Sequence, residues 1–168
     1  MDYQVSIVGG GISGALAALY LGKSRVKTCL IDRGKPSQRL SNPYIGKTTS
    51  LNLSSIASLR DVGIWEDIKK NAQEFNEIYV WDAEGSSSVQ FKAEEISRND
   101  LGVIVHNNII LESIYSKLEQ ISEVTLIEEE SLKEISQDQN KIELTSDSGL
   151  RIASCLLYTS PSPRDQRG

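Results

Sequence analysis

Three glycines near the start of the chain have the spacing of a diphosphate-binding turn. Gly9, Gly11 and Gly14 form the pattern G-x-G-x-x-G. In such a turn the first glycine permits a sharp change of direction, the second lets a pyrophosphate approach the backbone, and the third lets a helix pack closely on a strand. The backbone N–H groups around Ile12 and Ser13 would then face the phosphates, supported by the helix dipole. The pattern therefore indicates a dinucleotide ligand.

The segments around this turn predict the elements that position it. Residues 5–8 form an apolar strand, residues 12–22 are rich in helix formers, and residues 26–31 form a second apolar strand that ends at Asp32. A strand, a helix and a strand in this order predict a βαβ unit with parallel strands. The carboxylate of Asp32 can accept a ribose hydroxyl, and its charge disfavours the 2′-phosphate of NADP. These residues alone do not separate FAD from NAD.

The composition is that of a folded domain without a nucleic-acid-binding face. The chain has 168 residues, 39% of them hydrophobic, and 18 Lys and Arg against 23 Asp and Glu give a net charge of −5. No basic cluster is present to neutralise phosphates of a nucleic acid. The longest apolar run, residues 15–21, is far shorter than the ~20 residues of a membrane span, and the start lacks a signal-peptide pattern. The chain shows no metal-ligand or disulfide pattern among Cys29, Cys155 and His106. Together with the short apolar runs, this predicts a soluble protein of a reducing compartment.

The middle of the chain predicts a loop, two helices and antiparallel strands. The expected elements are a polar loop over residues 33–50, helices over 51–62 and 65–70, a hairpin over 75–91 and a strand over 101–105. Phe75, Tyr79 and Trp81 alternate along an extended segment and therefore share one face. The turn at Glu84-Gly85-Ser86 joins this segment to the second strand of the hairpin.

The last part of the chain predicts one helix and four strands. The helix starts at Asn107 or Asn108 and runs to about Gln120, with a buried stripe that includes Tyr115. The strands cover residues 124–127, 132–135, 142–144 and 150–152, and polar turns join the last three. We expect the first of these strands to join the parallel sheet.

Several motifs resemble those of FAD-dependent aromatic-ring monooxygenases, most closely the ubiquinone-biosynthesis hydroxylases. The glycine turn is similar to the entry βαβ unit of that family, and residues 59–65 resemble its "LGxW" stretch. Residues 79–85 resemble "V-x-D-x-x-G", residues 101–107 resemble "LGYVVEN", and the strands that end at residue 153 resemble "L-x-D-G-x-x-x-x-A". The resemblance covers residues 3 to about 154.

This resemblance implies a fold and a set of cofactor contacts. The fold is α/β: a Rossmann-like FAD-binding domain with a parallel sheet and a β-meander, and the incomplete start of an inserted antiparallel substrate-domain sheet. Residues 1–154 would be the N-terminal part of the FAD-binding monooxygenase domain, with residues 73–105 contributing to the substrate-side sheet. The implied cofactor-binding residues are Gly9, Gly10, Gly11, Ile12, Ser13, Gly14, Asp32, Arg33, Lys47, Asn107 and Leu132. Catalytic residues and metal ligands are not implied.

Two positions depart from the family pattern. The family carries Asp-x-Arg where this chain has Ile45-Gly46-Lys47. Lys47 keeps the positive charge of the arginine but loses its bidentate fork. His106 stands where the family commonly has glutamate. Both a proton shuttle and a helix-entry residue satisfied by the backbone stay open as roles for this histidine.

The end of the chain departs from the family more strongly. The family continues through a "LLVGADG" segment, and a later Gly-Asp segment holds the rest of the flavin. Residues 155–168 instead contain two prolines and resemble an adapter-derived sequence found at the ends of translated metagenomic reads. We therefore expect a non-native, disordered tail on a fragment that is inactive by itself, with a natural disordered tail as the alternative.

The resemblance also implies a reaction and its partners. The parent enzyme would use FAD, NAD(P)H and O₂ to hydroxylate an aromatic or polyprenylated quinone-precursor ring in ubiquinone biosynthesis. It would be cytoplasmic, with peripheral attachment to the inner membrane or to a biosynthetic complex left open. Three alternatives use the same kind of fold: an NAD-dependent dehydrogenase, another flavoprotein such as a reductase or halogenase, and a non-enzymatic GDP-dissociation inhibitor.

Overall fold

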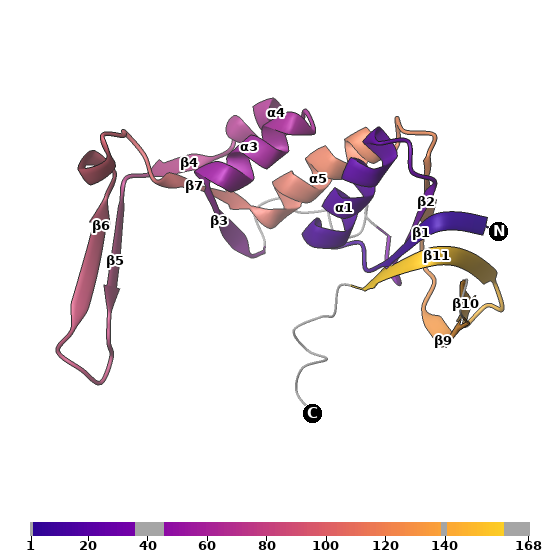
Figure 1. The fold of residues 1–168 in the computed structure, drawn as a ribbon. Helices are drawn as coiled ribbons and strands as arrows, with labels where there is room; N and C mark the ends of the chain where they lie inside the picture. Colours follow the sequence, from indigo (N-terminus) through magenta and orange to yellow (C-terminus); the bar gives the residue numbers. More distant parts are fainter. Residues whose placement is uncertain (1, 36–45, 139–140, 160–168) are drawn as a thin grey trace. The chain divides into compact units, whose positions relative to one another are not determined.

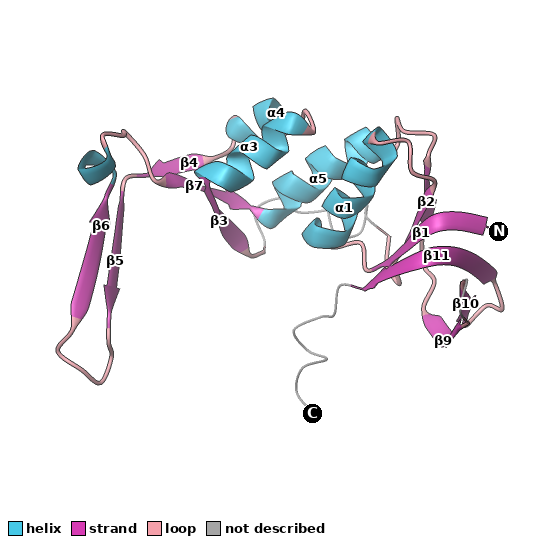
Figure 2. Cartoon of the chain, in the orientation of Figure 1, coloured by secondary structure: helices cyan, strands magenta, loops and turns pink. Residues whose placement is uncertain are grey.

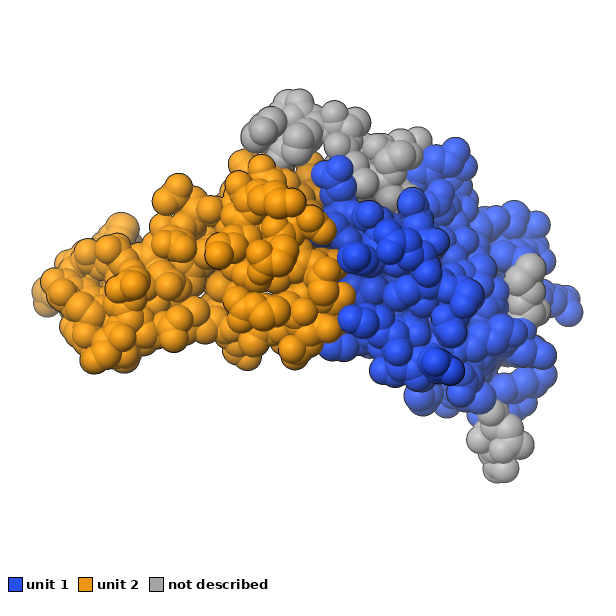
Figure 3. All heavy atoms as spheres, turned by 90° about the horizontal axis from the view of Figure 1, so that it is seen from above, with its two compact units in different colours: residues 1–42, 111–168 blue, residues 43–110 orange. Residues whose placement is uncertain are grey.

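The computed structural model describes residues 2–35, 46–138 and 141–159, and the chain divides into two compact units (Figure 3). The first unit contains residues 1–42 and 111–168, and the second contains residues 43–110. The glycine turn belongs to the first unit. The predicted hairpin belongs to the second.

A six-stranded sheet forms the framework of the first unit (Figures 1 and 2). Its strands, in spatial order, are β8 (Val124–Ile127), β2 (Thr28–Ile31), β1 (Asp2–Val8), β11 (Arg151–Thr159), β10 (Ile142–Ser146) and β9 (Leu132–Gln137). The first four are parallel, and β10 and β9 continue from β11 as an antiparallel meander. The predicted βαβ unit, parallel strand and meander are thereby confirmed.

Helix α1 (Ile12–Lys23) packs against β1, β2 and β8 through small and branched side chains. Ala15, Ala18 and Leu19 are completely buried, which brings the helix close to the sheet. At the end of α1, a Cβ atom on Gly22 would lie 2.5 Å from Cγ2 of Val124. The small residues of α1 therefore set the helix–sheet distance at both of its ends.

One apolar cluster joins the parallel strands to the meander. It contains Tyr3, Cys29 and Ile31 from the parallel part, and Leu144 and Ile152 from the meander. All five are buried, and burial of each large side chain contributes about 1.5–3 kcal/mol relative to exposure. The meander is thus part of the same core as the glycine turn's own strands.

The predicted disorder from residue 155 onward is wrong for residues 155–159. Strand β11 continues to Thr159, and its last part pairs with β1 from Leu156 opposite Val5 to Thr159 opposite Val8. The physical reason is that β1 has an edge whose backbone groups need partners, and this pairing does not depend on the polar, proline-containing composition of the tail. Residues 160–168, which hold those prolines, lie outside the described residues, and the origin of the tail stays a prediction.

The second unit contains a three-stranded antiparallel sheet and a separate hairpin. The sheet has the order β3 (Thr48–Asn52), β7 (Gly102–His106), β4 (Gln73–Phe75), and the hairpin pairs β5 (Glu77–Trp81) with β6 (Ser88–Lys92). The remaining elements are α3 (Leu53–Asp61), α4 (Trp65–Lys69) and the short helix η1 (Ala93–Ile96). Helix α5 (Asn107–Leu118) begins in this unit and continues into the first. Asn52 caps α3, because its side-chain oxygen accepts a hydrogen bond from Ser55 N at 2.8 Å.

Three details of the second unit differ from the sequence predictions. Leu51 lies in β3 and not in a helix, because β3 pairs with β7 and α3 starts only at Leu53. Residues 48–50, predicted as the end of the polar loop, are likewise paired in β3. Phe75 belongs to β4, whereas Tyr79 and Trp81 stack on each other in the hairpin with ring centroids 5.7 Å apart. The three aromatic side chains thus do not form one face.

No helix in the described part of the chain is long and apolar enough to span a bilayer.

Candidate cofactor site

The turn between β1 and α1 has the geometry that its glycines predict. Gly9 has a φ of 108°, a backbone conformation that residues other than glycine rarely adopt. Its N–H donates to the carbonyl of Ile31 at 2.9 Å. A Cβ atom on Gly14 would lie 2.0 Å from the carbonyl oxygen of Gly9. The start of α1 therefore rests directly on the backbone of the turn.

Gly11 leaves space at the start of α1. It is the N-cap residue of the helix, and a Cβ atom there would have no neighbouring atom within 4 Å. Glycine offers no side-chain acceptor to the helix N–H groups, and the first turn contains no acidic residue. An uncapped, unfilled helix start attracts an anion through its N–H groups and its dipole. The residues present therefore fit the diphosphate of a dinucleotide.

Asp32 connects the end of β2 to the glycine turn. Its carboxylate accepts hydrogen bonds from Gly10 N at 2.5 Å and from Gly34 N at 2.8 Å, and the residue is only 9% exposed. A carboxylate can accept about four hydrogen bonds, so it can hold the turn and also accept a ribose hydroxyl. Asp32 thus has a structural role that its spacing in the sequence did not reveal.

Tyr115 on α5 is a site residue that sequence reasoning missed. Its predicted place on the buried stripe of the helix is confirmed, since the residue is 6% exposed. Its hydroxyl donates to the carbonyl oxygen of Gly10 at 2.9 Å, across 105 positions of the sequence. The available signal was the residue type, because a tyrosine on a buried helix face needs a hydrogen-bond partner for its hydroxyl.

The segments beside Asp32 are tied together at the protein surface. The N–H of Glu130 donates to the backbone oxygen of Asp32 at 3.1 Å, and the ammonium of Lys35 lies 2.9 Å from the carboxylate of Glu129. Hydrogen bonding and charge attraction from Glu129 raise the pKa of Lys35 above its usual value. Arg33, predicted as a cofactor contact, is exposed.

Three further predicted contacts come from later parts of the chain. Lys47 and Asn107 belong to the second unit, where Asn107 N donates to the carbonyl of Lys47 at 2.9 Å. The side-chain oxygen of Asn107 accepts a hydrogen bond from the Thr49 hydroxyl at 2.5 Å, and the Lys47 side chain is exposed. Leu132 starts β9 in the first unit and packs, half-buried, against the apolar cluster.

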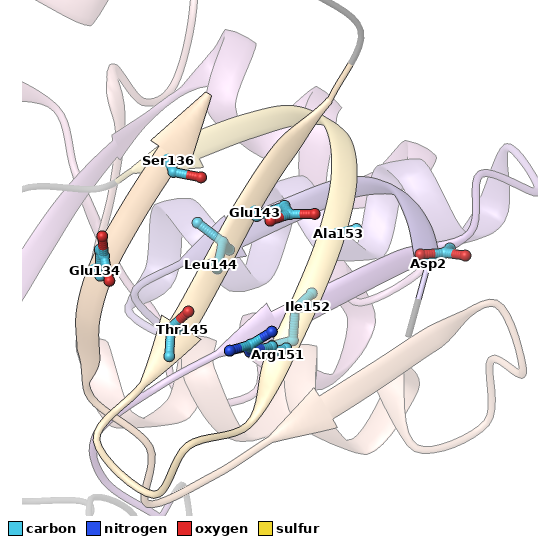
Figure 4. A pocket seen from close by; sticks show the side chains of 9 residues that line it. All are labelled: Asp2, Glu134, Ser136, Glu143, Leu144, Thr145, Arg151, Ile152 and Ala153. Atoms are coloured by element: carbon cyan, nitrogen blue, oxygen red, sulfur yellow. The ribbon is translucent and has the colours of Figure 1, made fainter. Parts of the chain in front are cut away.

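A separate hollow of about 390 Å³ lies on the meander (Figure 4). Its charged side chains are Asp2, Glu134, Glu143 and Arg151. Asp2 begins β1, whereas the glycine turn follows the opposite end of that strand. The hollow is therefore distinct from the candidate cofactor site. Among the residues that the structure describes, no group of three or more His, Cys, Asp or Glu could hold a metal ion.

Parallel strands, a glycine turn closed by backbone contact, and an acidic residue after the second strand define a dinucleotide-binding α/β protein of the Rossmann type. Comparison with known families places the chain more closely: it belongs to the FAD binding domain family, which it matches over residues 2–146. The predicted α/β FAD-binding fold is thereby confirmed.

Curated relatives include ubiquinone hydroxylases. The chain is 30% identical over 161 residues to the mitochondrial ubiquinone biosynthesis monooxygenase COQ6 of Dictyostelium discoideum, covering 86% of this chain and 32% of the relative. It is 25% identical over 163 residues to the ubiquinone hydroxylase UbiL of Rhodospirillum rubrum, covering 97% and 38%. The chain thus spans roughly a third of the length of these relatives. The resemblance to ubiquinone-biosynthesis hydroxylases is confirmed.

Solved structures share the fold at lower sequence identity. The p-nitrophenol 4-monooxygenase PnpA from Pseudomonas putida superposes with a TM-score of 0.76 at 19% identity, covering 98% of this chain and 42% of that chain. The flavin-dependent monooxygenase PieE, in complex with FAD and substrate, gives a TM-score of 0.73 at 16% identity, covering 94% and 30%.

Proposed function

We propose that this chain is the dinucleotide-binding part of an FAD-dependent monooxygenase that hydroxylates an aromatic or quinone-precursor ring in ubiquinone biosynthesis. The observation that supports it most is the glycine turn, closed by Gly14 and open at Gly11, in a chain of the FAD binding domain family. The names of the curated relatives support the reaction and the pathway.

The residues of the first unit would hold the adenosine diphosphate half of FAD. Backbone N–H groups at Gly11, Ile12 and Ser13 bind the diphosphate, and the open space at Gly11 lets it approach. Asp32 accepts a ribose hydroxyl while its backbone hydrogen bonds hold the turn. Arg33, Lys47, Asn107 and Leu132 are further proposed cofactor contacts. When bound and reduced, the flavin supplies the activation of O₂, and NAD(P)H is the proposed reductant.

The chain alone should bind ADP and FAD with similar, weak affinity. The reason is that the residues of this chain would contact mainly the ADP half of FAD. The relatives are about three times as long, and their further residues would contact the rest of the flavin. Calorimetric titration of the purified 168-residue chain with ADP, FAD and riboflavin tests it. Riboflavin, which lacks the diphosphate, should not bind. A purified chain with stoichiometric yellow flavin contradicts the weak affinity, and absence of ADP binding contradicts the site itself.

Ring hydroxylation is tested on a full-length protein that contains this region. With FAD, NADH or NADPH, a phenolic quinone precursor and ¹⁸O₂, the product should gain one ¹⁸O atom. Oxidation of the nicotinamide without labelled product under all substrates would instead favour a reductase. The same assay with chloride or bromide tests for a halogenase.

An NAD-dependent dehydrogenase is the alternative that uses the same turn. The match to the FAD binding domain family over residues 2–146 favours FAD. Competition of FAD and NAD for the full-length protein separates them, because a dehydrogenase would bind NAD and release no flavin on denaturation. Cytoplasmic location and attachment to a membrane or complex stay predictions.

A further inference from the structure

The buried contact between Tyr115 and Gly10 has a consequence for the diphosphate site. We propose that Tyr115 is a positioning residue: by holding the carbonyl of Gly10, its hydroxyl orients the peptide between Gly10 and Gly11 so that the N–H of Gly11 faces the diphosphate. This inference rests on the proposed function and adds a residue to it. Tyr115 does not itself touch the cofactor in this role.

The contact is a buried hydrogen bond between two residues that are far apart in the sequence. The Tyr115 hydroxyl donates to the Gly10 oxygen at 2.9 Å, and the Tyr115 side chain is almost fully buried. A Cβ atom on Gly10 would lie 2.3 Å from this hydroxyl oxygen and 3.0 Å from Oδ2 of Asp32. Position 10 therefore admits only glycine while both partners stay in place.

The geometry of the peptide bond links this contact to the direction of the Gly11 N–H. The carbonyl of Gly10 and the N–H of Gly11 belong to one planar trans peptide, so they point in opposite directions. Because the carbonyl points to the buried Tyr115 hydroxyl, the N–H of Gly11 points away from it. Gly11 is the N-cap of α1, on whose Cβ side no atom lies within 4 Å.

Asp32 fixes the preceding peptide in the same manner. Its carboxylate accepts the N–H of Gly10, which shares a planar peptide with the carbonyl of Gly9. That carbonyl is the one on which Gly14 rests. The two side chains thus hold consecutive peptides of a segment whose glycines have little conformational preference of their own.

Loss of the Tyr115 hydroxyl should free the second peptide. In the Tyr115→Phe variant, the Gly10–Gly11 peptide can rotate and present its carbonyl to the phosphates, which repels them. A hydrogen bond of this kind corresponds to a decrease in diphosphate affinity of about 3- to 10-fold. Affinity for a ligand without phosphate should be unchanged.

The test is a titration of the ¹⁵N-labelled 168-residue chain with ADP and, separately, with adenosine, followed by amide chemical shifts. The variants are Tyr115→Phe and, as the matched control, Tyr3→Phe. Tyr3 is equally buried in the same unit, at 7% exposure, but lies in β1 away from the turn. Thermal unfolding of all three proteins checks that each is folded.

We expect Tyr115→Phe to bind ADP 3- to 10-fold more weakly than the wild type and to bind adenosine with the affinity of the wild type. The Tyr3→Phe control should bind both ligands as the wild type does. In Tyr115→Phe the Gly11 amide signal should also broaden before ligand is added. Equal ADP affinity of Tyr115→Phe and wild type overturns the inference, as does an equal loss for ADP and adenosine. If the wild type itself shows no ADP-induced shift at the glycine turn, the proposed function fails, and the inference fails with it.

Discussion

The carbonyl oxygen of Gly9 lies 2.0 Å from the position that a Cβ atom on Gly14 would occupy. No rotation of a side chain can relieve such a contact, because both groups belong to the backbone. The oxygen is held in turn by the peptide whose N–H donates to Asp32. Any side chain at position 14 would therefore displace the backbone of the glycine turn or the start of α1.

Replacing Gly14 with alanine should destabilise the chain. Overpacking of a tight contact costs about 1–3 kcal/mol, so the free energy of unfolding in urea should fall by that amount. Gly11→Ala is the matched control, because no atom lies within 4 Å of its Cβ position and its φ is −71°. That variant should lose less than about 1 kcal/mol, from the poorer N-cap. Equal losses in the two variants would contradict the steric explanation.

The same Gly11→Ala variant should lose affinity for the diphosphate. Its methyl group enters the space at the start of α1 that the diphosphate is proposed to occupy. We expect ADP binding to weaken by at least about tenfold, or ~1.4 kcal/mol, as measured by calorimetry. Adenosine binding should change little. Unaltered ADP affinity would show that the diphosphate does not approach Gly11.

The glycine turn and the βαβ unit were predictable because their signals are local. Gly9, Gly14 and Asp32 each act within one supersecondary unit, so their spacing predicts their positions. The Tyr115 contact spans 105 residues, and no spacing rule reaches so far. The extension of β11 to Thr159 likewise depends on pairing with β1, at the other end of the chain. The proposed cofactor contacts of Lys47 and Asn107 follow from the family resemblance alone, because no local spacing rule connects these residues to the glycine turn.

Replacing Asp32 with asparagine should reduce both stability and ribose recognition. The amide has one acceptor oxygen, so one N–H donor loses its partner, either that of Gly10 in a buried contact or that of Gly34 in a part-buried one. We expect a loss of about 1–3 kcal/mol in the free energy of unfolding, together with weaker ADP binding. Asp67→Asn, on the exposed surface of α4, is the control and should change neither quantity. Unchanged stability of Asp32→Asn would contradict the assigned hydrogen bonds.

Cys29 should be unreactive in the folded chain and should make stability sensitive to alkaline pH. Burial raises the pKa of its thiol, which lies 3.1 Å from the Ser6 hydroxyl oxygen. Below the ordinary thiol pKa of about 8.5, both folded and unfolded states keep the proton, so stability is unaffected. Above it the unfolded thiol ionises while the folded one stays protonated, so stability falls as the pH rises.

Thiol titration and urea unfolding measure these two effects. An aromatic disulfide reagent at pH 8 should modify only the exposed Cys155 in the native chain, and both cysteines in urea. Between pH 8 and 10, the urea midpoint should fall less steeply in Cys29→Ala than in the wild type. Rapid modification of two thiols in the native chain would contradict the burial of Cys29.

Removing the end of β11 should destabilise the first unit. A chain that ends at Ser154 loses the pairing of Leu156–Thr159 with Val5–Val8, and β1 is left with an open edge. Since each backbone hydrogen bond contributes ~0.5–1.5 kcal/mol, we expect a loss of at least about 2 kcal/mol in urea unfolding relative to a chain that ends at Thr159. Leu156→Ser in the longer chain is the control, because this side chain is 64% exposed and its loss should matter little. Equal urea midpoints for the two chain lengths would mean that residues 155–159 do not stabilise the sheet, as a disordered tail would predict.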